Sequence, residues 1–375
     1  MRMRADEDLG INQGNLCVKG RFGWEYIHSP ERLTAPMIRK NGSLVKASWE
    51  EALALITQRW KEIKAAKGGA ALAGLCSPRL TNEELYSFQK FMRGVLETNH
   101  LDHAGGYSYA AHLALRDSLG YATSTSSINQ IRKADVILLL RSDLSETHPV
   151  IKSEVVMAVK RRKAKLIVVN SRQIYLNKFS AFNLQVRPAT EVTLINGMMQ
   201  AILQQGLAKE EFVQSRTEGF SPWRQSLEKY APEKVEALTG VPQAAFLAAA
   251  RLFAQASAGV TIISSGAFSG KQDRALALAA SDLALLTGHV GKENSGIFIL
   301  GEKNNSQGAL DMGVTPEWLP GYARCQDASE RSRFESAWER PLPNQAGIGA
   351  LAILQAAEEG KIQGLYVVGE NLVVT

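Results

Sequence analysis

The loop at residues 141–149 carries the residue types that best suit ligand binding. It contains Asp143 and His148 and leads into a helical pattern at 150–160. Its serine and threonine side chains can simply cap that helix by accepting hydrogen bonds from its first backbone N–H groups. The same helix start can hold a phosphate or diphosphate, which the N–H groups and the helix dipole favour. The sequence leaves both interpretations open.

Polar side chains also follow the next two expected strands. Asn170 and Arg172 come after the apolar run 165–169 and could hold a nucleotide base or ribose. Glu191 comes soon after a short expected strand at 184–187. Its carboxylate could accept hydrogen bonds from the N1–H and amino group of a guanine. Alternatively, it is an acid at a helix start, favoured there by the dipole.

Two further groups of residues could be reactive. Cys17 and Lys19 lie in a glycine-rich stretch, where a lone cysteine is more often inert than functional. The functional interpretation is an iron–sulfur ligand beside a cation, but a cluster takes about four thiolates and the chain has three distant cysteines. The second group crowds one segment and predicts either a reactive pocket or a Gly-Gly turn with packed tyrosines. Its members are His103, Tyr107, Ser108, Tyr109 and His112.

An α/β fold is needed to position these residues. The runs 134–140 and 165–169 are almost continuously apolar, which is typical of parallel strands buried on both faces. The connection between them should be right-handed. Ligands of such sheets bind outside the carboxyl ends of the strands, where the polar loops would lie.

Local signals predict several other elements. Ser48 and Thr81 each begin a capping box, because a glutamate follows three residues later. The helix after Ser48 should bury one face, and so should the helix after Thr81. These faces consist of Leu53, Ile56, Trp60 and Ile63 in the first helix, and of Leu85, Phe88, Met92 and Val95 in the second. Residues 274–287 should form a buried helix, and 304–313 should be a loop.

Length and composition exclude several classes of protein. A chain of 375 residues is too long for one ordinary core, so two or three lobes are expected. The net charge of +6 mildly favours anionic ligands, but no basic run with interleaved aromatics suggests nucleic acid. No apolar run approaches the roughly 18 residues of a membrane helix. The start lacks the apolar stretch of a secretory signal, and the cysteine usage favours a reducing, cytoplasmic setting.

Ordered motifs over almost the whole chain resemble the molybdopterin-dependent oxidoreductases. The similarity is to the formate dehydrogenase catalytic subunit and to the large iron–sulfur subunit of NADH-quinone oxidoreductase. The motifs that carry it lie at residues 16–24, 28–39, 145–149, 170–172, 216–220, 285–292, 304–313, 319–322 and 366–371.

The resemblance implies a domain organisation of two Rossmann-like lobes with parallel sheets, one inserted in the other. Residues 1–44 would be the remnant of an N-terminal iron–sulfur domain. Residues 45–102 and 276–375 would form one discontinuous α/β lobe, and residues 103–275 an inserted lobe of the dinucleotide-binding type. A pterin guanine dinucleotide lies between the two lobes in this family.

The resemblance also implies roles for particular residues. Cys17 would be the fourth ligand of a 4Fe-4S cluster, and Lys19 would lie between that cluster and the pterin. One nucleotide pocket would be lined by Asp143, His148, Asn170, Arg172 and Glu191. The residues approaching the cofactor from the other lobe would be Asn304, Asn305, Gln307 and Asp311.

The chain also departs from the family pattern. Tyr107, Ser108 and Tyr109 stand where formate dehydrogenases have selenocysteine or cysteine followed by histidine. Leu278 occupies the position of the formate-binding arginine, and Arg141 replaces a glycine. The three earlier cluster cysteines and a C-terminal cofactor-binding domain are not found, as expected for a fragment that holds neither the 4Fe-4S cluster nor molybdopterin guanine dinucleotide.

These departures favour a subunit of an electron-transfer complex, most like the iron–sulfur subunit of NADH-quinone oxidoreductase, with a degenerate molybdenum site. The alternative is the catalytic subunit of a formate dehydrogenase-like molybdenum or tungsten enzyme, in which Ser108 would ligate the metal. A nucleotide-binding module with no redox role is a third hypothesis. The partners would be other subunits of a redox complex, without nucleic acid or direct membrane insertion. The location would be cytoplasmic, peripheral to the membrane through those subunits.

Overall fold

The chain forms two compact units, each built from two separate stretches of sequence. The computed structural model describes residues 3–7, 10–103, 109–264 and 270–373. The large-sheet unit comprises Met1–Trp24 and Tyr107–Glu302, and the small-sheet unit comprises Glu25–Gly106 and Lys303–Thr375.

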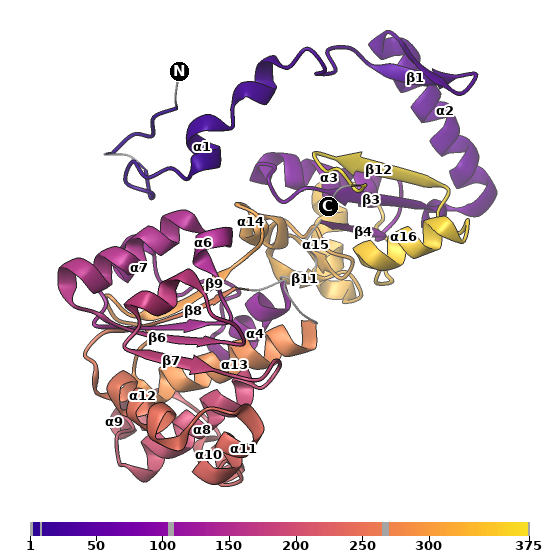
Figure 1. Cartoon of the computed structure of the whole chain (residues 1–375). Coiled ribbons are helices and arrows are strands. Elements are labelled where there is room, and N and C mark those ends of the chain that lie inside the picture. The colour runs from indigo at the N-terminus through magenta and orange to yellow at the C-terminus, as the bar shows by residue number, and fades with distance from the viewer. Residues whose placement is uncertain (1–2, 8–9, 104–108, 265–269, 374–375) are drawn as a thin grey trace. The chain divides into compact units, whose positions relative to one another are not determined.

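A parallel sheet of five strands, in the order β7-β6-β5-β8-β9, organises the large-sheet unit (Figure 1). All neighbours in it run parallel, as the two apolar runs predicted. In the central strand Leu138 lies opposite Ile167 on one side and Thr261 on the other. The strands are β5 (Val136–Leu140), β6 (Lys165–Asn170), β7 (Phe182–Gln185), β8 (Gly259–Ser264) and β9 (Gly296–Leu300).

Helices cover both faces of this sheet, which explains why its strands are apolar on both sides. Alternate residues of β5 enter different cores: Leu138 packs with one group of helices and Ile137 with the other. The first group is α4 (Tyr109–Leu119), α8 (Glu191–Gln204), α9 (Glu210–Arg216), α10 (Phe220–Leu227), α11 (Pro232–Thr239), α12 (Gln243–Gln255) and α13 (Gly270–Thr287). The second is α5 (Ile128–Ile131), α6 (Leu144–Thr147), α7 (Pro149–Arg162) and the 3-10 turn η4 (Tyr175–Phe179).

The small-sheet unit contains three parallel strands in the order β12-β3-β4. These are β12 (Gly364–Val368), β3 (Leu72–Cys76) and β4 (Leu101–His103). Its helices are α2 (Trp49–Lys67), α3 (Asn82–Gly94), α14 (Ser306–Asp311), α15 (Ala328–Trp338) and α16 (Ala350–Glu358). Shorter elements are η1 (Glu25–His28), η2 (Gly69–Ala71), η5 (Pro320–Tyr322), and the hairpin pairs β1 (Met37–Lys40) with β2 (Ser43–Lys46) and β10 (Trp318–Leu319) with β11 (Ala323–Arg324). The short helix α1 (Val18–Phe22) is the first helix of the chain and belongs to the large-sheet unit.

The observed units divide the chain differently from the expected boundary at residue 276. That boundary falls inside α13, a continuous helix, and β9 pairs with β8 of the large sheet. Residues 276–302 therefore belong with the large-sheet unit rather than with the discontinuous lobe. The assignment of residues 1–44 to an iron–sulfur domain stays a prediction.

The structure also corrects two expectations about single elements. Leu53 and Ile56 of α2 are 53% and 41% exposed, so only Trp60 and Ile63 of the expected apolar face pack against the core. Residues 306–311 form the short helix α14 rather than a loop. Gly308 permits this helix to pack closely, because a Cβ atom there would stand 2.1 Å from the side-chain oxygen of Asn82.

The two expected capping boxes have different outcomes. At α3, Thr81 accepts from the Glu84 N–H and the Glu84 side chain accepts from the Thr81 N–H, which confirms the complete box. At α2, Ser48 accepts from the Glu51 N–H, but the Glu51 carboxylate pairs with Lys40 instead. The helix after Thr81 buries Leu85, Phe88 and Met92, whereas Val95, just beyond its end, is exposed.

In the described part of the chain, no single helix is both long and apolar enough to span a membrane. One pair, α11 with α12, passes the same length and composition test only when combined across a bend of 110°.

A fully buried arginine joins the two stretches of the small-sheet unit. Arg93 of α3 donates to the carbonyl oxygens of Gly313, Thr315 and Trp318 at 2.7–2.9 Å. It also donates to the side chains of Gln89 and Asn99. Burial lowers the pKa of Arg93 to about 10, and the guanidinium is therefore still charged at neutral pH.

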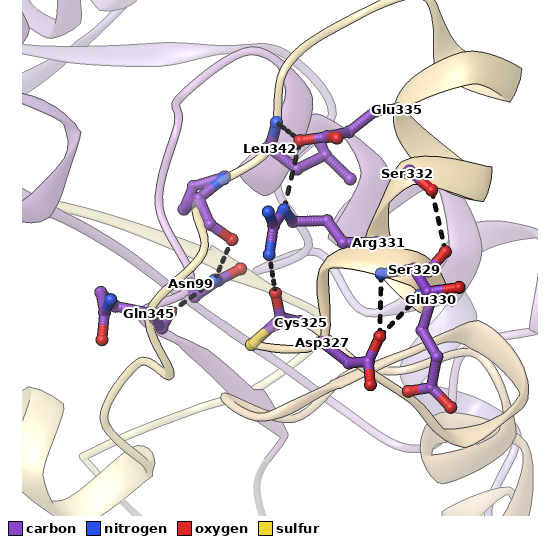
Figure 2. Close-up of polar contacts among 11 residues, drawn as sticks. Asn99, Cys325, Asp327, Ser329, Glu330, Arg331, Ser332, Glu335, Leu342 and Gln345 are labelled. Atoms are coloured by element: carbon purple, nitrogen blue, oxygen red, sulfur yellow. Dashed lines mark hydrogen bonds and ion pairs between the residues drawn. The ribbon is translucent and has the colours of Figure 1, made fainter.

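Asn99 extends this connection to the segment after α15. Its side-chain amide donates to the carbonyl oxygens of Pro343 and Gln345, at 2.9 and 2.7 Å. Figure 2 shows these contacts beside those that fix the 325–342 segment, where Arg331 donates to the Cys325 carbonyl and Glu335 accepts from the Leu342 N–H. Side chains, rather than sheet pairing, hold this stretch in place.

Replacing Arg93 should destabilise the small-sheet unit. In Arg93→Met the carbonyls of Gly313, Thr315 and Trp318 lose a buried donor, and each such loss costs about 1–3 kcal/mol. We expect a loss of at least about 3 kcal/mol, measured by hydrogen exchange of α3 amides. The control is Arg59→Met on exposed α2, which should change stability by less than about 0.5 kcal/mol. A loss below about 1 kcal/mol for Arg93→Met would contradict this role.

His289 is a buried histidine whose charge state links stability to pH. It is 1% exposed, and its Nε2–H donates to the Phe253 carbonyl at 2.9 Å. Its Nδ1 has no hydrogen-bond partner among the described residues. Burial lowers the pKa of His289 to about 4, so the ring is neutral in the folded chain at neutral pH.

The large-sheet unit should therefore lose stability on acidification. As the pH falls below 6.5, the ordinary pKa of histidine, the unfolded chain binds a proton that folded His289 does not take up until about pH 4. This residue alone should cost roughly 2 kcal/mol between pH 7 and pH 5. Denaturant unfolding at both pH values should show a smaller pH dependence in His289→Gln, whose amide can still donate to Phe253. An unchanged pH dependence would contradict the assignment.

Candidate functional site

The carboxyl ends of β5 and β6 bring two of the expected binding residues together. Arg172, after β6, places a guanidinium N–H 3.3 Å from the Asp143 carboxylate, after β5. The other Asp143 oxygen accepts from the Ser145 N–H and so caps the short helix α6. Asn170 accepts from the Arg172 backbone N–H and shapes the turn that carries this side chain. The guanidinium is largely exposed, so it can reach an anionic or planar ligand.

His148 connects the same edge to the end of β9. Its Nε2 lies 3.0 Å from the Gly301 carbonyl and its Nδ1 2.9 Å from the Thr147 hydroxyl. Burial lowers the pKa of His148, which favours a neutral ring. His148 stands at the N-cap of α7 but gives that helix no side-chain cap. The expected serine or threonine cap of α7 is therefore absent, and the side-chain cap in this loop is made by Asp143 at α6.

Two polar side chains near this edge make no hydrogen bond among the described residues. Glu191, the first residue of α8, is 4% exposed as a whole residue, and its carboxylate, which keeps contact with solvent, makes no hydrogen bond or ion pair there. The Ser145 hydroxyl is fully buried and has no partner there. Buried polar groups normally have partners because desolvation is costly. A ligand with N–H donors would supply the partner that Glu191 lacks.

Arg141, directly after β5, forms an ion pair within the large-sheet unit. Its backbone has φ 50°, a left-handed conformation that favours glycine. Its guanidinium turns into the unit and donates to the carboxylate of Asp273 in α13, and both side chains are buried. The bulky residue at a family glycine position is thus accommodated by a charge pair within the large-sheet unit.

In the small-sheet unit, the expected cofactor residues around α14 divide into two groups. Asn305 donates to the Leu80 carbonyl and to Asn82, so it holds the start of the helix in place. Asn304 is exposed. Gln307 donates to Asp311, one turn later, at 2.7 Å.

Tyr322 contacts both Gln307 and Asp311, although the sequence did not identify it as a site residue. Its hydroxyl donates to the Asp311 carboxylate at 2.5 Å and accepts from the Gln307 amide at 3.1 Å. The backbone of Tyr322 has φ 66°, so the turn after Gly321 directs this ring. The 319–322 motif was the available signal for its importance.

The structure does not assemble the expected iron–sulfur and metal ligands. Cys17 caps α1, where its sulfur accepts from the Gly20 N–H at 3.4 Å, and Lys19 is exposed on that helix. No group of three or more possible metal ligands occurs within the described residues. Ser108 lies outside them. Leu278, which the resemblance alone places at the position of the formate-binding arginine, lies on α13 and packs partly buried against the core.

The large-sheet unit thus fits the nucleotide part of the implied cofactor. The exposed guanidinium of Arg172 suits a phosphate or a base face, and Glu191 suits adjacent N–H donors of guanine. An iron–sulfur cluster needs about four ligands, so Cys17 alone does not test the expected cluster, and its role as a ligand stays a prediction.

Comparisons with known proteins agree with this architecture. The family model "Molybdopterin oxidoreductase" matches residues 32–375. Subunit alpha of F420-dependent formate dehydrogenase 2 from Methanococcus maripaludis is 35% identical over 97% of this chain and 53% of its own length. Formate dehydrogenase H from Escherichia coli is 34% identical over 98% and 53%. NADPH-Fe(3+) oxidoreductase subunit alpha from Geobacter sulfurreducens is 36% identical over 97% and 42%.

A solved structure supports the fold. Acetylene hydratase from Pelobacter acetylenicus superposes with a TM-score of 0.63 at 21% identity, covering 73% of this chain and 38% of that one. The chain spans about half, or less, of the length of these curated relatives. With the family model matched over almost its whole length, this chain belongs to the molybdopterin oxidoreductase family.

Proposed function

We propose that this chain is part of a subunit of an electron-transfer complex, one that keeps the guanine-nucleotide site of its family and has lost the residues for formate oxidation. The observation that carries the proposal is Glu191, whose carboxylate makes no hydrogen bond or ion pair among the described residues, at the start of α8. The guanine end of a pterin dinucleotide offers two adjacent N–H donors to such a group.

Arg172 and Asp143 support the same assignment. Their ion pair fixes the guanidinium after β6 while leaving most of it exposed. A planar guanidinium can stack on a base or bind phosphate oxygens. When bound, the dinucleotide supplies the redox-active metal–pterin group. The residues of the large-sheet unit would hold and orient its nucleotide end.

The proposed loss of formate chemistry is based on Leu278. Formate binding requires a cation for the carboxylate. At that position the chain has an aliphatic side chain packed on the core. The cation one turn earlier, Arg274, is paired with Asp117. This pattern supports a protein similar to the large iron–sulfur subunit of NADH-quinone oxidoreductase, with redox subunits as partners at a cytoplasmic or membrane-peripheral location. Cys17 and Lys19 would form part of the relay, with the remaining cluster ligands outside this chain.

A second candidate is a formate dehydrogenase-like catalytic subunit. Two of the relatives are named as formate dehydrogenases. In that case Ser108 would serve as a metal ligand. Stoichiometric molybdenum or tungsten together with formate-dependent dye reduction, abolished by Ser108→Ala, would favour this candidate over the electron-transfer subunit.

Guanosine monophosphate should bind the chain through Glu191. Calorimetric titration should show that Glu191→Gln weakens binding by about tenfold or more, because an isosteric amide presents an N–H group to the guanine donors. Inosine monophosphate lacks the amino group and should be less sensitive to the substitution. The control is Glu210→Gln, which changes an exposed acid in the first turn of α9.

The simpler alternative for Glu191 is a carboxylate that only complements the helix dipole. In that case Glu191→Gln would lower the unfolding temperature slightly and leave the affinity for guanosine monophosphate unchanged. That outcome, or no binding of the nucleotide to the unaltered chain, would overturn the proposal.

A further inference from the structure

A second pocket of the large-sheet unit lies among helices α9, α10 and α13. Its cavity volume is about 100 Å³, well below the roughly 300–1,000 Å³ of drug-sized ligand sites, so the pocket suits only a small molecule. Its lining consists of Val213, Thr217, Glu218, Phe220, Trp223, Asp282, Leu285 and Leu286. Apolar side chains form most of this lining, and its charged members are both acids.

This pocket lies away from the edge that carries the candidate nucleotide site. Helix α13 follows the carboxyl end of β8 and runs back to precede the start of β9. Its last turns, which carry Asp282 and Leu286, therefore lie toward the amino ends of the strands. The pocket is consequently separate from Glu191 and Asp143, and the inference does not depend on the proposed function.

The Asp282 carboxylate is the polar centre of this pocket. Its Oδ2 accepts from the Trp223 indole N–H at 2.9 Å. Its Oδ1 makes no hydrogen bond among the described residues. Burial raises the pKa of Asp282, which shows that its charged form is poorly solvated here. No lysine or arginine is among the described residues that line the pocket.

Aromatic rings provide a second feature suited to a cation. Phe220 and Trp223 stack with their centroids 5.8 Å apart and an interplanar angle of 29°. The faces of such rings attract ammonium and guanidinium groups, and tryptophan does so most strongly. Glu218 lies at the exposed side of the pocket and makes no ion pair among the described residues.

We propose that this pocket binds a small organic ammonium ion with an apolar body. The apolar body would contact Val213, Leu285 and Leu286, and the ammonium group would lie between Asp282 and the aromatic rings. An anion would meet two carboxylates and no lining cation. A divalent metal ion would meet only two carboxylates in a largely apolar wall, whereas calcium takes six to eight oxygen ligands.

The test compares phenethylammonium with 2-phenylethanol, a neutral molecule of similar shape, by calorimetric titration of the full chain. The ammonium ion should bind at least about tenfold more tightly than the alcohol. Asp282→Asn keeps an acceptor for the Trp223 N–H but removes the charge. It should weaken the ammonium ion by about tenfold and leave the alcohol unchanged.

Two further variants keep the test decisive. Glu218→Gln, at an exposed position that is tolerant of change, should weaken the ammonium ion by about threefold even if Asp282→Asn does not fold. Glu211→Gln, an exposed acid of α9 outside the pocket, should have no effect. Equal affinity for both probes, no binding of either, or an ammonium affinity unaffected by both pocket substitutions would overturn the proposal.

Discussion

The parallel alignment of five strands is the constraint on which the candidate site depends. Because every strand of the large sheet runs the same way, every carboxyl end meets one edge. Asp143 follows β5, Arg172 follows β6 and Glu191 follows β7, although nearly fifty residues separate the first from the last. Helices on both faces leave that edge as the place where polar side chains avoid burial in the core. The parallel topology of the sheet therefore determines where the candidate site lies, and the side chains at that edge determine what it can bind.

A different constraint holds the small-sheet unit together. Its two stretches of sequence are separated by the whole 107–302 segment, so neither can fold around its neighbours in sequence. Strand β12 joins β3 through backbone hydrogen bonds, but the 313–345 segment has only short strands of its own. Arg93 and Asn99 donate to carbonyls of that segment instead. A charged group can be buried here because five acceptors surround it, and the acceptors are mostly backbone carbonyls fixed by the fold.

Local sequence signals predicted those parts of the structure that depend on local physics. The strands at 134–140 and 165–169, the capping box at Thr81 and the helix from Glu191 each follow from short patterns. The exposure of Leu53 and Ile56 in α2 was not predicted, because amphipathic spacing indicates a face without showing how much of it other elements cover. Helix α14 was missed because its glycine and asparagines are typical of loops, and the close approach of Asn82 that Gly308 permits comes from a segment more than two hundred residues earlier.

The candidate site shows the same limit for side chains. Asp143, Asn170 and Arg172 were predicted from their positions after apolar runs, and the structure brings them together. The pairing of Arg141 with Asp273 and the contact of Tyr322 with Asp311 involve no periodic signal. The sequence shows that Arg141 replaces a glycine of the family but not that Asp273 pairs with it. A residue that departs from a family pattern can therefore be judged only together with the residue that compensates for it.

Glu191 and Asp282, two acids of the large-sheet unit, differ in the kind of ligand that each would bind. Glu191 lies at a helix start, where the dipole stabilises its charge without a hydrogen bond, and adjacent donors of a flat base can complete it. Asp282 lies inside a helix, away from the start where the dipole stabilises an anion, and among the described residues only the Trp223 indole donates to it. Its charge therefore requires compensation by a cation more than Glu191 does. The position of each carboxylate along its helix therefore favours neutral N–H donors as the partner of Glu191 and a cation as the partner of Asp282.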